Sequence, residues 1–276
     1  MPTNNTFTST KEEWKRLADI DYFGMYVKAY IPFNAWMNLN FPEASDRAKI
    51  NTIKRESNIF RNKIVALLQD DSQDGADFRA RLGELHNTLE QAQIYNQGRV
   101  ISFRTMRFKN EGRHFQDEEK RGIIFHVHCG DAGHPFEGKT VLSIKGHKRL
   151  GGETTHFFKE FPEYEYDKTA VLVSLSQLNN QAWRQEILFL YQSIAPMLEI
   201  DLVSGAPNKE GKETTSVECG RFYFVPDAVK VAQGLIEVLY NLRNALFHGE
   251  INPNGDANKV YGAAYHLLRI PFPPRA

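Results

Sequence analysis

The sequence predicts a mainly α-helical bundle that is interrupted by a β-containing insertion, so that the fold is α+β overall. Three observations support this prediction. Apolar residues recur at helical spacing in residues 1–98 and again in residues 179–276. Residues 99–178 instead carry short β-branched and aromatic runs separated by Gly, Pro and His. We expect the three segments to form one composite domain.

The N-terminal segment is expected to contain three helices. The first covers residues 11–40 and should kink or break at Pro32, because proline lacks an amide hydrogen and clashes with the preceding turn. The second covers residues 46–69. The third, residues 76–95, follows a polar loop at residues 70–75 and carries a single apolar stripe.

The middle and the end of the chain show other patterns. Strands are expected within residues 100–103, 123–129, 140–144, 169–175 and 219–225, a helix within residues 181–200, and a flexible loop within residues 204–216. The last long helix, residues 226–248, has the clearest 3.6-residue period of the sequence. Pro226 suits its first turn, and Gly249 suits a left-handed cap at its end. Residues 257–269 should form a final helix.

The composition is that of an ordinary soluble globular protein, with 41% apolar and 25% charged residues. Lys plus Arg and Asp plus Glu both total 34, so binding of nucleic acid by overall charge is not indicated. The two cysteines, Cys129 and Cys219, are too few for a disulfide framework. We expect a cytoplasmic protein with no signal peptide and no contact with a membrane.

The polar face of the last long helix carries the most promising candidate site, made by Arg243, Asn244 and His248. Asn244 and His248 lie one turn apart, whereas Arg243 is about 140° of rotation from His248 in a straight helix. Two copies packed across a two-fold axis would bring both pairs into one cleft. Carbonyl groups at the helix end favour an imidazolium at His248, and a guanidinium stabilises charge on a phosphate. These groups suffice to cleave RNA without a metal or another cofactor.

The segment Leu242-Arg-Asn-Ala-Leu-Phe-His-Gly-Glu250 resembles the R-x(4–6)-H motif of HEPN domains. That resemblance covers roughly residues 226–269. It implies a helical bundle, commonly dimeric, and a metal-independent endoribonuclease of the kind found in toxin–antitoxin and phage-defence systems. It also implies that Arg243 and His248 are catalytic, that Asn244 assists them, and that a cognate antitoxin or defence partner exists. The β-containing insertion departs from the minimal bundle of that family.

The bare Arg–His spacing is common in this chain, and the context of the motif therefore carries the hypothesis. Only the last pair has Asn directly after the arginine and closes a long helix before a glycine. The alternative explanation of this pair is structural: His248 caps the end of the helix, and Arg243 is a surface ion-pair partner. Seven pairs have four to six intervening residues: Arg79–His86, Arg81–His86, Arg107–His114, Arg121–His126, Arg121–His128, Arg149–His156 and Arg243–His248.

Two other groups of residues permit alternative functions. His126 and His128 lie on one face of the strand expected at residues 123–129, and Cys129 lies on the other. The two histidines could bind zinc in a metal-dependent enzyme, but no further spaced ligands are visible, and the polar face of a half-exposed strand is the more common explanation of such a pair. A HEPN-like module that binds a nucleotide or a protein without catalysis is the other alternative.

A basic and aromatic segment offers a candidate surface for single-stranded RNA. Arg104, Arg107 and Lys109 are the residues that we expect to contact RNA, through phosphates, with bases stacked on neighbouring phenylalanines. A solvated strand edge would explain the same pattern. Asn34, a polar residue in an apolar helix, is expected either in the core or in support of the site. The segment also includes Arg99, Arg113, Phe103 and Phe108.

Overall fold

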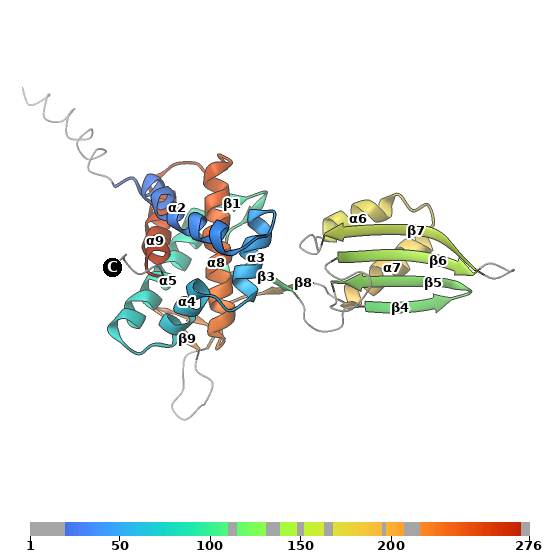
Figure 1. Ribbon diagram of the computed structural model, residues 1–276, viewed down its shortest axis with the longest axis horizontal. Coiled ribbons are helices and arrows are strands. Elements are labelled where there is room, and N and C mark those ends of the chain that lie inside the picture. The colour runs from blue at the N-terminus through green and yellow to red at the C-terminus, as the bar shows by residue number, and fades with distance from the viewer. Residues whose placement is uncertain are drawn as a thin grey trace, which may run out of the picture. The chain divides into compact units, whose positions relative to one another are not determined.

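The protein combines a bundle of α-helices with antiparallel sheets and is a mixed α+β protein. A computed structural model describes residues 20–109, 115–130, 139–147, 152–162, 168–194, 197–206 and 216–271. The chain divides into two compact units, a helical unit of residues 1–106 and 201–276 and an inserted unit of residues 107–200 (Figure 1). Within the described ranges, none of the helices combines the length and the apolar character that a bilayer span requires.

The described part of the helical unit contains six helices, and one of them, α8, runs through the middle of the bundle (Figure 1). Helix α8 contacts α2, α3, α4 and α9, and α5 packs along α9. Its apolar stripe, which includes Leu235, Val238 and Leu242, is fully buried, as the 3.6-residue period predicts. The helices are α2 (Tyr22–Asn40), α3 (Asp46–Arg55), α4 (Ile59–Gln69), α5 (Gln73–Ala92), α8 (Ala228–Phe247) and α9 (Gly255–Arg269).

The prediction of a single helix over residues 46–69 is wrong, because Asn58 separates α3 from α4. Its side-chain carbonyl accepts a hydrogen bond from the amide of Arg61 at 2.9 Å and caps α4. Its side-chain amide donates to the carbonyl of Ile53 at 2.8 Å and satisfies the end of α3. One asparagine therefore satisfies backbone groups of both helix ends, which the apolar period alone does not indicate.

The boundaries of α2 and α5 also differ from the expected ones. Helix α2 continues through Pro32, so the chain does not break there, and it ends before Pro42. Residues 11–19 of the expected first helix lie outside the described residues. Ser72 caps α5 by accepting from the amide of Gly75, so the loop expected at residues 70–75 is shorter.

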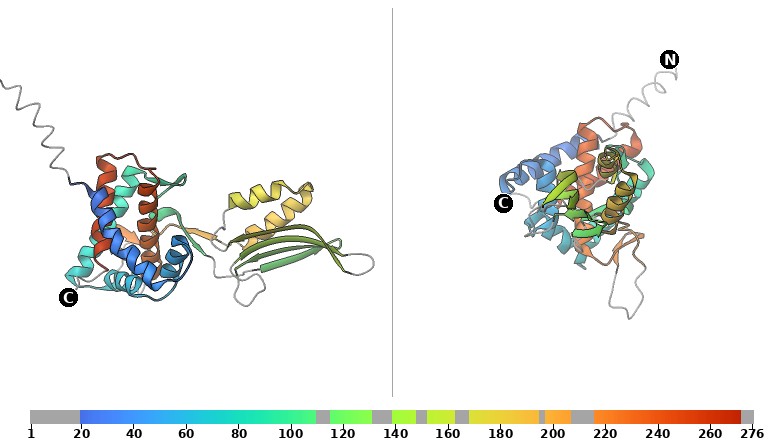
Figure 2. Two further views of the ribbon diagram at one scale, coloured as in Figure 1. Left: turned by 45° about the horizontal axis from the view of Figure 1, so that its top comes forward. Right: turned by 90° about the vertical axis from the view of Figure 1, so that its right-hand side faces the viewer.

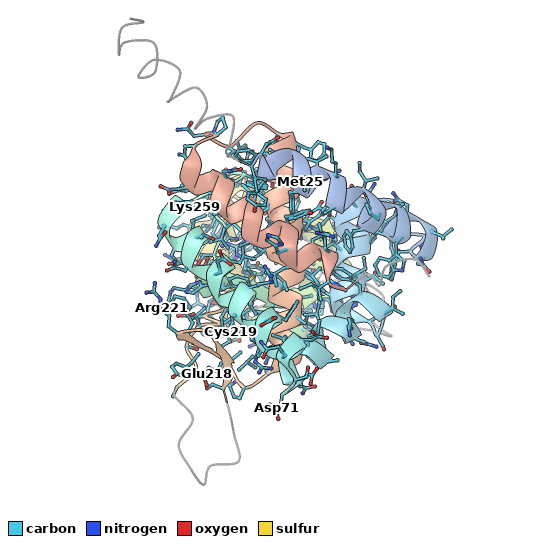
Figure 3. All side chains as sticks on the ribbon, turned by 90° about the vertical axis from the view of Figure 1, so that its left-hand side faces the viewer. Met25, Asp71, Glu218, Cys219, Arg221 and Lys259 are labelled. Carbon is cyan, nitrogen blue, oxygen red and sulfur yellow. The ribbon has the colours of Figure 1, made fainter. Side chains whose placement is uncertain are left out.

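Among its described residues, the helical unit also contains two β-hairpins and a 3-10 turn, η1 (Phe103–Thr105). The first hairpin pairs β1 (Tyr95–Asn96) with β2 (Arg99–Val100) through Gln97 and Gly98, both at positive φ. The second pairs β9 (Val217–Cys219) with β10 (Phe222–Phe224) and lies against α5 (Figure 3). A Cβ at Gly83 of α5 would lie 2.3 Å from the carbonyl oxygen of Cys219, so glycine is required for this contact.

The inserted unit is a four-stranded antiparallel sheet in the order β4-β5-β6-β7, with α6 and α7 on one face (Figure 2). Phe125, Val127, Leu142 and Ile144 of the sheet form a core with residues of both helices, including Ile187. Strands β3 and β8 form a separate pair. The elements are β3 (Met106–Lys109), β4 (Phe115–Lys120), β5 (Ile123–Cys129), β6 (Lys139–His147), β7 (Glu153–Pro162), α6 (Lys168–Ser176), α7 (Gln181–Ile194) and β8 (Met197–Ile200).

The expected segment limits differ from the two observed units, because α7 packs on the sheet and not in the bundle. The strand expected at residues 169–175 is wrong, since this run is part of α6. Val171 and Leu175, four residues apart, both bury against the sheet core on one helical face. The helix expected over residues 181–200 ends at Ile194, and residues 197–200 form β8.

Candidate functional site

The end of α8 forms the Schellman cap that Gly249 predicts. The amide of Glu250 donates to the carbonyl of Ala245 at 2.9 Å, and the amide of Gly249 donates to that of Leu246 at 3.3 Å. Gly249 has a φ of 69°, which permits the turn. His248 is the residue at the C-cap, and its side chain is exposed at the end of the helix.

Arg243 is held by four neighbours from two other helices and its own. Its Nη1 donates to Oδ1 of the buried Asn244 at 3.0 Å. Its Nη2 lies 3.4 Å from Oδ2 of Asp46 in α3. The guanidinium carbon lies 4.9 Å from the ring centre of Phe247 and 6.0 Å from that of Tyr30 in α2. A quarter of the Arg243 side chain remains exposed, so an anion in solution can reach it.

The polar face of α8 continues one and two turns earlier as an ion-pair network. Glu237 receives two hydrogen bonds from Nη1 of Arg47, at 2.7 and 2.9 Å, and one from Nζ of Lys54 at 2.7 Å. Burial alone would raise the pKa of Glu237, but the two cations lower it to about 2. Arg47 also lies 4.5 Å from the ring centre of Tyr240. This network fixes α3 against α8 beside Arg243.

The β1–β2 hairpin holds the segment that carries the motif at both of its ends. Nδ2 of Asn96 donates to Oδ1 of Asn241 at 3.2 Å. The amide of Gln97, in the turn of the hairpin, donates to Oε2 of Glu250 at 2.7 Å. Arg243, Asn244 and His248 therefore lie on a stretch of chain that is fixed both before and after them.

Two polar side-chain atoms of α2 are buried without a hydrogen-bond partner in the described part of the chain. Tyr30 is 5% exposed, and no described residue forms a hydrogen bond with its Oη. Oδ1 of Asn34, one turn later, is likewise buried without a hydrogen-bond partner in the described part of the chain. The sequence singled out Asn34 but not Tyr30, because a tyrosine in an apolar helix has the pattern of a core residue.

Within one chain, Arg243 and His248 have different surroundings. The guanidinium turns toward Asp46 and Tyr30, and no hydrogen bond or ion pair among the described residues joins it to His248. Asn244 is buried and orients Arg243, so it is not an open polar position on the helix face. One chain thus supplies an oriented cation and, one turn away, an exposed imidazole.

The structure describes only part of the basic and aromatic segment. Arg104 is paired with Asp201 at 2.9 Å and lies 3.8 Å from Glu90. Phe103 is fully buried, so it is not available for stacking on a base. Arg107 is exposed but belongs to the inserted unit. The side chains of Lys109 and Arg113 lie outside the described residues.

His126 and His128 share one face of β5, as expected, with parallel rings whose centres are 6.4 Å apart. Nδ1 of His126 contacts Oδ1 of Asp117 on β4, and His128 is fully buried. Among the residues that the structure describes, no group of three or more His, Cys, Asp or Glu side chains is arranged to hold a metal ion. The arrangement gives no support to a zinc site here.

Comparisons with protein-family models, with curated proteins and with solved structures found no match to this chain.

Proposed function

We propose that the protein is a metal-independent endoribonuclease of the HEPN type that acts as a homodimer. The observation that carries the proposal is the end of α8, where buried Asn244 orients the guanidinium of Arg243 and the glycine cap presents His248 to solvent. A cation that is oriented and partly exposed suits a phosphate diester, and an exposed imidazole one turn away suits proton transfer.

The reaction needs three groups and no oxidant or cofactor. His248 accepts the proton of the ribose 2′-hydroxyl, and O2′ forms a bond to the adjacent phosphorus. Arg243 stabilises the negative charge on the phosphate oxygens in the transition state. The bond from phosphorus to O5′ then breaks, and O5′ leaves with a proton donated by an imidazolium, which in a two-fold dimer is His248 of the second copy. The products are a 2′,3′-cyclic phosphate and a 5′-hydroxyl.

The wider role of the protein is proposed from the resemblance of residues 242–250 to HEPN motifs. By this resemblance we propose that the enzyme belongs to a toxin–antitoxin or phage-defence system, with RNA as substrate and a cognate antitoxin or defence partner. A HEPN-like module that binds a nucleotide without cleaving it is the second candidate. The contact between Asp46 and Arg243 is relevant to this candidate, because a carboxylate at 3.4 Å offsets part of the positive charge that would stabilise a transition state.

Cleavage of RNA by purified single variants tests the proposal. We expect His248→Ala to lower the cleavage rate by about 10²- to 10⁴-fold, because it removes the proton acceptor. Arg243→Ala should lower it by about 10²- to 10³-fold, because it removes charge stabilisation. Rates are measured on labelled single-stranded RNA in excess EDTA, with circular dichroism as a check of folding.

Matched controls are His266→Ala on α9 and Arg221→Ala at the turn between β9 and β10, which change the same residue types elsewhere in the helical unit. Both should cleave RNA at the wild-type rate. Cleavage by the two site variants at the wild-type rate would contradict the proposal, and loss of wild-type activity in EDTA would favour a metal enzyme. Nucleotide binding without any cleavage would favour the binding module.

A further inference from the structure

The hydroxyl of Tyr30 is one of several buried polar atoms of the helical unit that have no hydrogen-bond partner in the described part of the chain, and its ring lies beside Arg243. Tyr30 is 5% exposed, and its Oη has no hydrogen-bond partner among the described residues. Buried hydroxyls in folded proteins almost always have a partner, because an unpaired one loses its hydration without compensation. Because the Tyr30 ring lies beside Arg243, a ligand bound by Arg243 is a candidate partner for this hydroxyl.

The surroundings of Tyr30 define the chemistry of that ligand. Its ring lies 6.0 Å from the guanidinium carbon of Arg243. Burial raises the pKa of Tyr30 well above its ordinary value, while Arg243 and Arg47 act in the opposite direction. The phenol therefore stays protonated at neutral pH and is a hydrogen-bond donor. Oxygens with negative charge complement a neutral donor beside a guanidinium.

We propose that Oη of Tyr30 donates a hydrogen bond to a phosphate group bound by Arg243, so that Tyr30 is a substrate-contacting residue that the motif does not include. The inference rests on the proposed function, since it assigns a second donor to the same phosphate. A cation and a neutral donor from different helices hold two oxygens of one phosphate, and this fixes its orientation toward the attacking 2′-hydroxyl.

Asp46 would compete with a bound phosphate for the guanidinium of Arg243. Its carboxylate lies 3.4 Å from Nη2 of Arg243 and is 37% exposed, so it can turn away into solvent. A phosphate that binds Arg243 must displace this carboxylate. Asp46→Asn should therefore tighten phosphate binding about three- to fivefold, the size expected for a partly exposed ion pair. This variant tests phosphate binding at Arg243, and the Tyr30 variant below tests the hydroxyl.

The experiment is a titration with inorganic phosphate, observed by NMR at tyrosines labelled with ¹³C at Cζ. In the wild-type protein, the Tyr30 signal, assigned by its absence in Tyr30→Phe, should shift on binding. The affinity of Tyr30→Phe for phosphate, followed at the labelled guanidinium of Arg243, should fall about tenfold or more, as for a hydrogen bond to a charged group. An unshifted Tyr30 signal, or an unchanged affinity of the variant, would overturn the proposal.

Tyr26 provides a matched control on the same helix, one turn earlier. Its Oη is also buried but donates to the carbonyl of Leu239 at 2.5 Å. Tyr26→Phe should lower the melting temperature by several degrees and leave phosphate affinity unchanged, because it removes an internal hydrogen bond. Tyr30→Phe should leave the melting temperature unchanged or raise it. If the Tyr30 hydroxyl had a structural role, Tyr30→Phe would instead lower the melting temperature.

Cleavage assays separate this inference from the proposed function. Suppose that wild-type protein cleaves RNA and that Tyr30→Phe cleaves it equally fast and binds phosphate with equal affinity. The proposed role of Tyr30 is then wrong, and the proposed endoribonuclease function is supported. If wild-type protein does not cleave RNA but phosphate still shifts Tyr30 and binds Tyr30→Phe more weakly, the site binds a phosphate ligand and the proposed function fails.

Discussion

Among single residues, Glu237 should have the clearest effect on stability. Its carboxylate is 16% exposed and pairs with Arg47 and Lys54, which keep its pKa near 2. The ordinary pKa of this group is 4.5. Because the folded pKa is the lower of the two, the stabilisation is fully present above about pH 4.5 and is lost as the pH falls toward 2.

The resulting prediction concerns the free energy of unfolding between pH 5 and pH 3. Titration of Glu237 should account for about 2 kcal/mol of the loss over this interval. Urea denaturation at both pH values measures it, and Glu237→Gln should lose about 2 kcal/mol less than wild type over the same interval. Replacement of the exposed Glu218 by Gln is the control and should keep the wild-type difference. An identical pH dependence in Glu237→Gln would disprove the assignment.

The sequence indicated Arg243, Asn244 and His248 because they lie close together on one well-patterned helix. It did not indicate that Asn244 is buried, that Asp46 contacts Arg243 or that Tyr30 lacks a partner. Each of these features depends on contacts between α8 and the N-terminal helices, and a pattern within one segment contains no information on them. Residues whose role is local were therefore predictable, and those whose role comes from packing were not.

Among the elements, the end of α8 depends on Gly249 for its shape. At a φ of 69°, an L-residue is strained even though a Cβ there would meet no atom within 4 Å. We predict that Gly249→Ala lowers the free energy of unfolding by about 1–2 kcal/mol. It should also slow RNA cleavage, because a frayed cap no longer positions His248. Chemical denaturation and the cleavage assay measure the two effects.

Gly255 provides the control for that variant. It also has open space around a Cβ, but it lies in the first turn of α9 without a positive φ. Gly255→Ala should leave stability unchanged or raise it slightly, since alanine is the better helix former. Equal destabilisation by the two substitutions would show that strain at residue 249 is not the cause.

Elements with a strong period and clear end signals were predicted well. The helix at residues 226–248 and the strand at residues 123–129 correspond closely to α8 and β5. The run at residues 169–175 was predicted wrongly as a strand. Its β-branched residues favour strands, but packing on the sheet selects a helix. Side-chain hydrogen bonds at Asn58 decide the break between α3 and α4, and apolar spacing does not report them.

At the scale of the whole molecule, the two ends of the inserted unit lie next to each other. Strand β3 pairs with β8, and just inside the helical unit the amide of Leu202 donates to the carbonyl of Phe103 at 3.0 Å. We predict that replacing residues 107–200 by a short Gly/Ser linker leaves the helical unit folded. Circular dichroism should retain the helical spectrum, and thermal unfolding should remain cooperative.

A second deletion variant, with a linker of the same length but a scrambled sequence, is the control for linker composition. Both linkers have to close the same short gap and should therefore give the same result. Loss of the cooperative transition in both deletion variants would show that the bundle requires the inserted unit. The sequence predicted an insertion but not these limits, because α7 has an ordinary amphipathic pattern that does not reveal which partner its apolar face contacts.

The β1–β2 hairpin has a further consequence for how the site forms during synthesis. Its bonds to Asn241 and Glu250 join residues 145 and 153 positions apart. A ribosome makes the hairpin first and must then translate the whole insertion before the residues it holds exist. The nascent chain therefore passes most of its synthesis without a complete site, and assembly of the site is a late step set by closure of this long loop.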